Sequence, residues 1–200
     1  MSRIFLLRHA QSVANDKGFL AGRMDGISLS KKGIAQRELL NSRLQGAKFD
    51  QVISSPIQRC LETLADFHQA PEIAHSFQEV DYGDWTGKKF TSLQRNKGWR
   101  EIYKHPASVR FPNGETLPEV QTRALAGLDL HIRKKSKNIL IATHGDVVKS
   151  LVLHALGSHL NSIDKLEIDN ASITVLHRDG NALRVLAVND LHSNLIDLMK

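Results

Sequence analysis

Short runs of apolar residues constrain the fold of this chain more than any other feature of its sequence. The runs RIFLL at 3–7 and NILIAT at 138–143 are almost continuous, and a third run, DQVISS, lies at 50–55. Continuous apolar strands are typical of sheets that are covered on both faces, as parallel sheets are. We therefore expect a buried, largely parallel central sheet.

Segments with helical signals separate these strands. Helices are expected over 31–44, 55–67, 117–132 and 145–157, with a short strand over 72–76. Near the end, ASITVLH and LRVLAV flank the turn sequence RDGN and predict a hairpin. The alternation indicates an α/β fold, a three-layer sandwich with helices on both faces of the sheet. We expect one domain over 1–200, with an insertion of weak periodicity and some helix at about 82–112.

Capping residues predict where the first two of these helices begin. Ser28 or Ser30 can cap the helix over 31–44. Three apolar residues of that helix are expected to face the core: Ile34, Leu40 and Leu44. Ser55 and Pro56 suit the N-cap and the first position of the helix over 55–67.

The two later helices have clearer signals. Thr116 and Glu119 have capping-box spacing, and Gly157 is placed to end the helix over 145–157. Apolar residues step along one face of the helix over 117–132: Leu117, Val120, Ala124, Leu128 and Ile132.

Composition and charge exclude several classes of protein. A chain with 41% hydrophobic and 24% charged residues is typical of an ordinary globular protein, and no apolar run approaches the ~20 residues of a membrane span. The run IFLL is too short for a signal peptide, so we expect a cytoplasmic protein. The single cysteine, Cys60, excludes an internal disulfide and a thiolate zinc cluster. A net charge of +6 favours an anionic partner, although charge alone does not choose between nucleic acid and a phosphorylated metabolite.

Polar residues follow three of the predicted strands. Arg8 and His9 end the first strand, Ser54 and Ser55 the second, and His144 follows NILIAT. The carboxyl ends of strands in an open α/β sheet line a ligand-binding crevice, so these residues should meet at one edge. Arg59 lies one turn into the following helix and should return to the same edge, because helical side chains lean toward the N-terminus.

This cluster suits the chemistry of phosphate. Alone, each histidine is more often a structural residue and Arg59 an ion-pairing one, but together Arg8 and Arg59 can clamp a phosphate dianion. His9 is then the candidate nucleophile, provided that its other ring nitrogen finds an acceptor that fixes the tautomer. His144 would donate a hydrogen bond to the transferring group.

Other catalytic centres do not fit the sequence. A cysteine phosphatase needs arginine six positions after the cysteine, where Asp66 stands. GDWTGKK has the wrong spacing for a P-loop, and His154 and His159 are five residues apart, which does not place them on one helical face as a metal-binding pair. We therefore expect no metal and no organic cofactor.

Across nearly its whole length the chain resembles the histidine phosphatase superfamily, in the branch that includes cofactor-dependent phosphoglycerate mutases. The matching segments are LLRHAQSVAN, AGRMDGISLSKKGIAQ, ISSPIQRCLET, QEVDYGDWTG, FPNGETLPEV and IATHGDVVKSL. The resemblance implies a catalytic set of His9, Glu79, His144, Arg8 and Arg59. It also implies substrate contacts from Arg8, Asn15, Arg59, His144 and Gly145.

Three acidic residues compete for the general acid role. The resemblance points to Glu79, four residues before Gly83, whereas the residues alone leave Asp81 and Asp84 open. A carboxyl group here would protonate the leaving oxygen and then activate water. Glu115, in the segment FPNGETLPEV, would either orient other site residues or only precede a helix cap.

One residue departs from the family pattern. Ala10 stands where the family usually has glycine after the nucleophile, and its methyl group would tighten the phosphate pocket if glycine were needed there.

The resemblance predicts a phosphatase that hydrolyses a small phosphomonoester through a phosphohistidine on His9. The alternative enzyme is a phosphoglycerate mutase; family mutases usually carry a longer insertion between the second arginine and the second histidine. An alternative of another class is a phosphate-binding regulator with little turnover, which Ala10 motivates. The expected partner is a small phosphorylated substrate, with no nucleic acid and no membrane. The sequence names neither the physiological substrate nor the oligomeric state.

Overall fold

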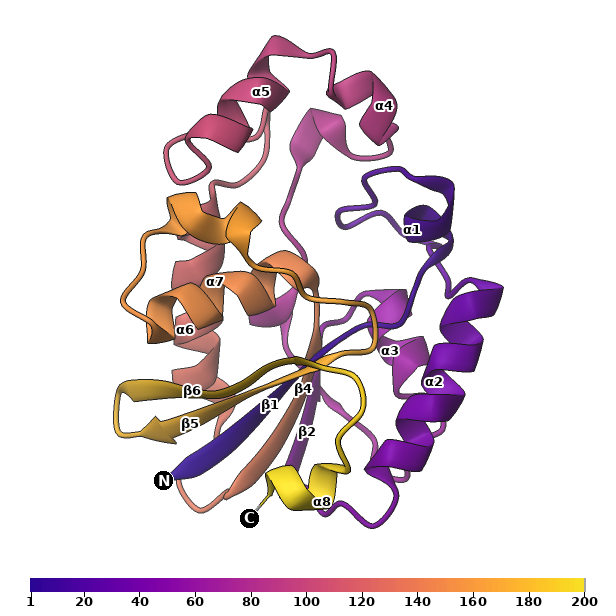
Figure 1. Cartoon of the computed structure of the whole chain (residues 1–200), viewed down its shortest axis with the longest axis vertical. Coiled ribbons are helices and arrows are strands. Elements are labelled where there is room, and N and C mark those ends of the chain that lie inside the picture. Colours follow the sequence, from indigo (N-terminus) through magenta and orange to yellow (C-terminus); the bar gives the residue numbers. More distant parts are fainter. Residues whose placement is uncertain (200) are drawn as a thin grey trace.

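The computed structural model describes residues 1–199 and contains one six-stranded sheet (Figure 1). From edge to edge the strands are β3 (Glu72–Ile73), β2 (Gln51–Ser54), β4 (Asn138–Thr143), β1 (Ser2–Arg8), β5 (Ile173–Asp179) and β6 (Ala182–Asp190). The first four are parallel, and β5 pairs antiparallel with both β1 and β6. The predicted α/β fold with a largely parallel sheet is confirmed. We propose that the chain is one domain, since strands from both ends of it share this sheet.

Helices cover both faces of the sheet because alternate strand residues point to opposite sides. Ile4 and Leu6 pack in a core with α6 (Leu117–His131) and α7 (Gly145–Ala155). Phe5 and Leu7 pack in a second core with α2 (Lys31–Leu44), α3 (Gln58–Thr63) and α8 (Leu195–Leu198). Figure 1 shows these two groups of helices on opposite sides of the strands. None of the helices described over residues 1–199 is long and apolar enough to cross a membrane.

The remaining short elements lie mostly beyond the carboxyl ends of the parallel strands, toward the top of Figure 1. They are α1 (Val13–Lys17), η1 (His75–Phe77), η2 (Gly83–Trp85), α4 (Phe90–Leu93), α5 (Lys97–Lys104) and η3 (Leu160–Lys165). The predicted insertion at 82–112 contains η2, α4 and α5. Its aromatic rings contact one another: the ring centroids of Trp85 and Trp99 are 5.4 Å apart, and those of Tyr82 and Phe111 are 4.9 Å apart.

One apolar residue of α2 does not face the core as expected. Ser30 is the N-cap of this helix, its hydroxyl accepting from the Gly33 amide, and Leu40 and Leu44 are buried. Ile34, however, is 41% exposed. The inward face passes through Gly33, whose missing side chain lets the helix touch the backbone of Gln11, and the next residue along is rotated by about 100° toward solvent.

The helix expected over 55–67 is shorter than predicted. It begins at Gln58 and ends at Thr63, with Ile57 as an N-cap that makes no side-chain hydrogen bond. The Ser55 hydroxyl accepts from the Ile57 amide and pairs with a histidine ring instead of capping the helix. The predicted roles of Ser55 as N-cap and Pro56 as first helical residue are therefore wrong.

Other predicted boundaries agree more closely with the structure. The capping box of Thr116 and Glu119 is present, and Gly157 has a φ of 61° just beyond the end of α7. The strand expected over 72–76 has only two residues, because the chain turns into η1 at His75.

Candidate active site

Two histidines meet where adjacent parallel strands end. Arg8 is paired with Thr143 in the register of β1 and β4, so the next residues, His9 and His144, extend from the same edge of the sheet. Their ring centroids are 5.3 Å apart, and both side chains are buried. The structure therefore brings together the strand-end residues that the sequence predicted would converge.

Arg59 links the two histidines. Its Nε donates to His9 Nε2 at 3.0 Å, and its Nη2 donates to His144 Nδ1 at 3.0 Å and to the Gly22 carbonyl at 2.9 Å. The side chain is only 2% exposed although it begins on α3, as expected for a long side chain that leans back toward the sheet edge. We call Arg8, His9, Arg59 and His144 the histidine–arginine cluster.

The cluster holds two buried guanidinium nitrogens without hydrogen-bond partners among residues 1–199. They are Arg8 Nε and Arg59 Nη1. Another nitrogen of Arg8, Nη1, donates to the Ile168 carbonyl, which fixes the orientation of the group. Buried donors are normally satisfied, so two such positions on arginines that line the same cavity indicate a place for an anionic acceptor.

His9 is neutral and its tautomer is fixed. Its Nδ1 lies 2.7 Å from the Ala10 carbonyl, which can only accept, so Nδ1 carries the proton. Nε2 accepts from Arg59 and therefore bears the lone pair. Burial, followed by the charges of Arg59 and Arg8, holds the pKa of His9 well below its usual value. The Ala10 carbonyl is the acceptor that the sequence analysis required without identifying it.

His144 has the opposite arrangement of ring nitrogens. Nδ1 accepts from Arg59, so the proton lies on Nε2, which donates to the Ser55 hydroxyl at 2.9 Å. Burial and the Arg59 charge hold its pKa well below the usual value. Cys60 Sγ lies 3.5 Å from the same Nε2. Burial raises the pKa of this thiol to about 12, which keeps it protonated.

Glu79, in the loop after η1, lies beside Arg59 and His144. Its Oε2 is 3.9 Å from Arg59 Nη2 and 3.8 Å from His144 Nδ1, and its Oε1 accepts from the Val80 amide. Burial, and then the charge of Asp146, raise the pKa of Glu79 to about 7 against the opposing effect of Arg59. The Glu79 carboxyl group can therefore be either protonated or ionised near neutral pH.

The competing carboxylates have other partners. Asp81 accepts from the Gly83 amide, and Asp84 accepts from the Asn113 side chain. Their side chains are thereby engaged in the turns around η2.

Arg123, on α6, binds the backbone of the segment that carries Glu79. It was not predicted from the sequence. Arg123 donates to the carbonyls of Ser76, Gln78 and Glu79, and Glu115 accepts from its guanidinium. Glu115 also accepts from the Asp81 amide and forms an ion pair with Arg23 at 2.8 Å. The structure thus favours the orienting role for Glu115 over a mere position before the helix cap.

The two predicted substrate contacts outside the cluster have clear local roles. Asn15 lines the cavity beside His9, while its side-chain oxygen accepts from the Ser12 amide in a capping box of α1. Gly145 begins α7, and a Cβ there would lie 3.3 Å from Arg8 Nε. A side chain at this position would crowd the arginine, so glycine suits it.

Ala10 causes no distortion at the departure from the family pattern. Its φ is not positive, and it packs in a small buried cluster with Leu29 and Ala171. It is absent from the described residues that line the cavity. The methyl group therefore packs against Leu29 and Ala171 and is not part of the described cavity lining.

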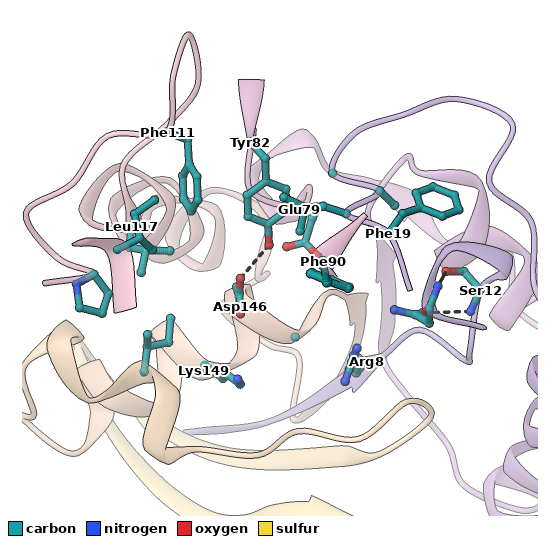
Figure 2. A pocket seen from close by; sticks show the side chains of 18 of the residues that line it. Arg8, Ser12, Phe19, Glu79, Tyr82, Phe90, Phe111, Leu117, Asp146 and Lys149 are labelled. Atoms are coloured by element: carbon teal, nitrogen blue, oxygen red, sulfur yellow. Dashed lines mark hydrogen bonds between the residues drawn. The ribbon is translucent and has the colours of Figure 1, made fainter. Parts of the chain in front are cut away.

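Arg8, His9 and Arg59 of the cluster line a cavity of about 390 Å³, whose lining also includes polar residues that were not predicted from the sequence. Figure 2 shows the Tyr82 hydroxyl directed at Asp146, to which it donates at 2.7 Å, with Lys149 nearby. Asp146 directly follows the second His-Gly pair, a position that could have marked it as a site residue. Within residues 1–199, no three or more His, Cys, Asp or Glu side chains gather in a way that could hold a metal ion.

Comparisons with known proteins agree on the kind of fold and family. Phosphoserine phosphatase 1 of Hydrogenobacter thermophilus is 27% identical over 197 residues, which cover 94% of this chain and 92% of that protein. The 2,3-bisphosphoglycerate-dependent phosphoglycerate mutase of Bartonella quintana is 30% identical over 179 residues, covering 82% of this chain and 86% of the mutase.

A solved structure with the same fold is that of a mutant phosphoserine phosphatase from Entamoeba histolytica in complex with phosphoserine. It has a TM-score of 0.86 at 22% identity and covers 96% of this chain and 98% of that one. Residues 4–191 match the family model of the histidine phosphatase superfamily (branch 1), so the chain belongs to this superfamily.

Proposed function

We propose that this protein hydrolyses a small phosphomonoester through a phosphohistidine on His9. The observation that carries the proposal is the histidine–arginine cluster: a neutral histidine with a fixed lone pair lies beside two buried guanidinium nitrogens that lack partners within residues 1–199. Phosphate oxygens are suitable acceptors for such nitrogens. Related phosphatases in the same superfamily support this reaction class.

In the first step the phosphate of the ester binds between Arg8 and Arg59. Arg59 Nε then donates to a phosphate oxygen instead of to His9, and the freed Nε2 lone pair attacks phosphorus. The bond between phosphorus and the ester oxygen breaks, and Glu79 transfers its proton to the leaving alcohol. A pKa of about 7 suits Glu79 to this task near neutral pH.

In the second step the Glu79 carboxylate takes a proton from water, whose oxygen attacks the phosphohistidine. The bond between phosphorus and nitrogen breaks, inorganic phosphate leaves, and both His9 and Glu79 return to their first states. His144 assists by donating from Nδ1 to the transferring group. This requires Arg59 Nη2 to turn from Nδ1 to a phosphate oxygen, Nδ1 to take a proton from water, and Nε2 to return one to water. The Ser55 hydroxyl can donate as well as accept, so it supports either tautomer.

Phosphoglycerate mutase activity is the second candidate, favoured by the 30% identity to a mutase. A mutase would return the phosphoryl group to a phosphoglycerate instead of to water. Incubation with phosphoglycerates distinguishes the two reactions, because hydrolysis releases inorganic phosphate in proportion to substrate consumed. Release of phosphate from an ester also rules out a regulator without turnover.

The covalent step is tested by trapping. During turnover of ethyl phosphate, a rapid alkaline quench should preserve a phosphoramidate, which is labile to acid, and peptide mapping should place it on His9. His9→Ala should abolish both label and turnover. Turnover should persist in a metal chelator, and orthovanadate should inhibit competitively as an analogue of the transferring group. Near-normal turnover of His9→Ala, or a label on His144, would refute the assignment.

A further inference from the structure

The cavity extends beyond the histidine–arginine cluster, and its lining includes a set of apolar side chains. We call this part the apolar chamber and define it by six residues: Phe19, Phe90, Trp99, Phe111, Leu117 and Ile163. Figure 2 shows Phe111 and Leu117 on the far side of Tyr82 from Arg8, and Phe19 and Phe90 on the same side of Tyr82 as Arg8. A phosphate group fills only a small part of a 390 Å³ cavity, so the alcohol of the ester faces this lining.

The chamber wall is held in place by ring contacts and backbone hydrogen bonds. Phe90 and Trp99 have ring centroids 6.2 Å apart, and Trp85 packs edge-on against Phe111 at 5.7 Å. The Phe90 amide donates to the Gly18 carbonyl, which ties the start of α4 to the loop that carries Phe19. An apolar wall fixed in this way can bind an apolar group without first having to become ordered.

Few charged groups line the cavity away from the cluster. Asp146 accepts from the Tyr82 hydroxyl, and Asp164 is exposed to solvent. Lys149 and Glu79, the candidate general acid, are the other charged lining residues outside the cluster in this part of residues 1–199. A short, highly polar alcohol would leave most of the aromatic wall without a partner, whereas an apolar ring would be removed from water against it.

The geometry points to a substrate class: phosphomonoesters whose alcohol carries an apolar ring or chain, with the apolar chamber as its binding site. This inference rests on the proposed phosphatase activity and adds the identity of the leaving group. Phe90, Trp99 and Phe111, half of the chamber residues, lie in the insertion at 82–112, so we expect the insertion to contribute to specificity.

The test compares esters that differ only in the group the chamber would bind. Ethyl phosphate and 2-phenylethyl phosphate are both primary alkyl esters, so their intrinsic reactivities are similar. We expect kcat/KM to be at least about tenfold higher for 2-phenylethyl phosphate, the size of effect that burial of several apolar carbons gives. O-phosphoserine and 3-phosphoglycerate should be no better than ethyl phosphate.

A pair of matched variants locates the effect. Phe90→Ala removes a half-buried ring from the chamber and should lower kcat/KM for 2-phenylethyl phosphate by about tenfold, with a change below about twofold for ethyl phosphate. Phe67→Ala removes a similarly half-buried ring that packs on Phe49, outside the cavity lining, and should leave both values unchanged. If Phe90→Ala fails to fold, the comparison of esters with the unaltered protein still decides the matter.

Three outcomes would overturn the inference. One is equal kcat/KM for ethyl and 2-phenylethyl phosphate. Another is an equal loss for both esters in Phe90→Ala. The third is a preference for O-phosphoserine or 3-phosphoglycerate that Lys149→Met abolishes, since the cavity would then recognise a second charged group. Failure of the phosphatase proposal is recognised separately, by the absence of a label on His9 with any ester.

Discussion

The two ends of the cavity are built in different ways. In the histidine–arginine cluster, Arg8 ends β1, and His9 and His144 directly follow β1 and β4, so the pairing of parallel strands fixes the position of their backbone. Arg59 reaches them from the first turn of α3. The apolar chamber comes from short helices and loops that are held by contacts between aromatic rings. One end is determined by backbone pairing and the other by side-chain packing, which suits a fixed reaction and a variable substrate.

Glu79 lies between the two ends, and among the replacements that compare these ends its own should have the largest effect. Glu79→Gln removes the proton donor for the leaving alcohol, so kcat/KM for ethyl phosphate should fall by about 10³-fold. The loss for p-nitrophenyl phosphate should be far smaller, because its leaving group needs little protonation. Steady-state kinetics with both esters, under conditions where phosphoenzyme formation limits the rate, measures this difference.

Asp81→Asn is the matched control, since Asp81 is a nearby carboxylate whose side chain bonds to the Gly83 amide. It should change kcat/KM for either ester by less than about threefold. A large loss for ethyl phosphate in Asp81→Asn, together with a small one in Glu79→Gln, would transfer the acid role to Asp81.

The difference between the two ends also explains what the sequence could predict. Continuous apolar runs identify buried parallel strands, and their carboxyl ends must meet at one edge, so the proximity of His9 and His144 followed from topology. The roles of His9, Arg59 and the other site residues stay predictions until catalysis is measured. The choice of Glu79 over Asp81 depended on resemblance to a family, because the sequence of a loop does not show which of its carboxylates is buried beside the cluster.

Features that depend on local packing were not accessible in the same way. The helical pattern could not show that Gly33 makes the closest contact of α2, which turns Ile34 outward. Ser55 was an ordinary N-cap candidate until the structure placed its hydroxyl against His144. The pairing of Tyr82 with Asp146 joins residues 64 positions apart, a separation at which periodicity gives no information.

The pH dependence of turnover tests whether Asp146, in the cavity, acts on the general acid Glu79. Glu79 must be protonated to assist the leaving alcohol, so turnover of ethyl phosphate should decline as pH rises through its pKa of about 7. The negative charge of Asp146 helps to raise that pKa. Asp146→Asn should lower the pKa of Glu79 and move the decline to lower pH, while the amide oxygen still accepts from Tyr82.

Asp164→Asn provides the comparison, because it removes an exposed carboxylate from the same cavity. We would measure kcat/KM against pH for the unaltered protein, Asp146→Asn and Asp164→Asn. Only Asp146→Asn should show the alkaline decline at lower pH. An unchanged decline in that variant would mean that burial by itself sets the pKa of Glu79.

The smallest effect on turnover is expected for Ala10→Gly. This variant tests whether alanine, at a position where the family usually has glycine, alters the histidine–arginine cluster. Ala10→Gly removes a buried methyl group from its contacts with Leu29 and Ala171, and it gives the unfolded chain more freedom. The free energy of unfolding, measured by urea denaturation, should fall by about 1 to 2 kcal/mol. Turnover should change by less than about twofold, because the carbonyl that fixes the His9 tautomer belongs to the backbone and is retained. A tenfold or greater gain in turnover would instead show that the methyl group obstructs phosphate binding, as a regulator with a disabled site requires.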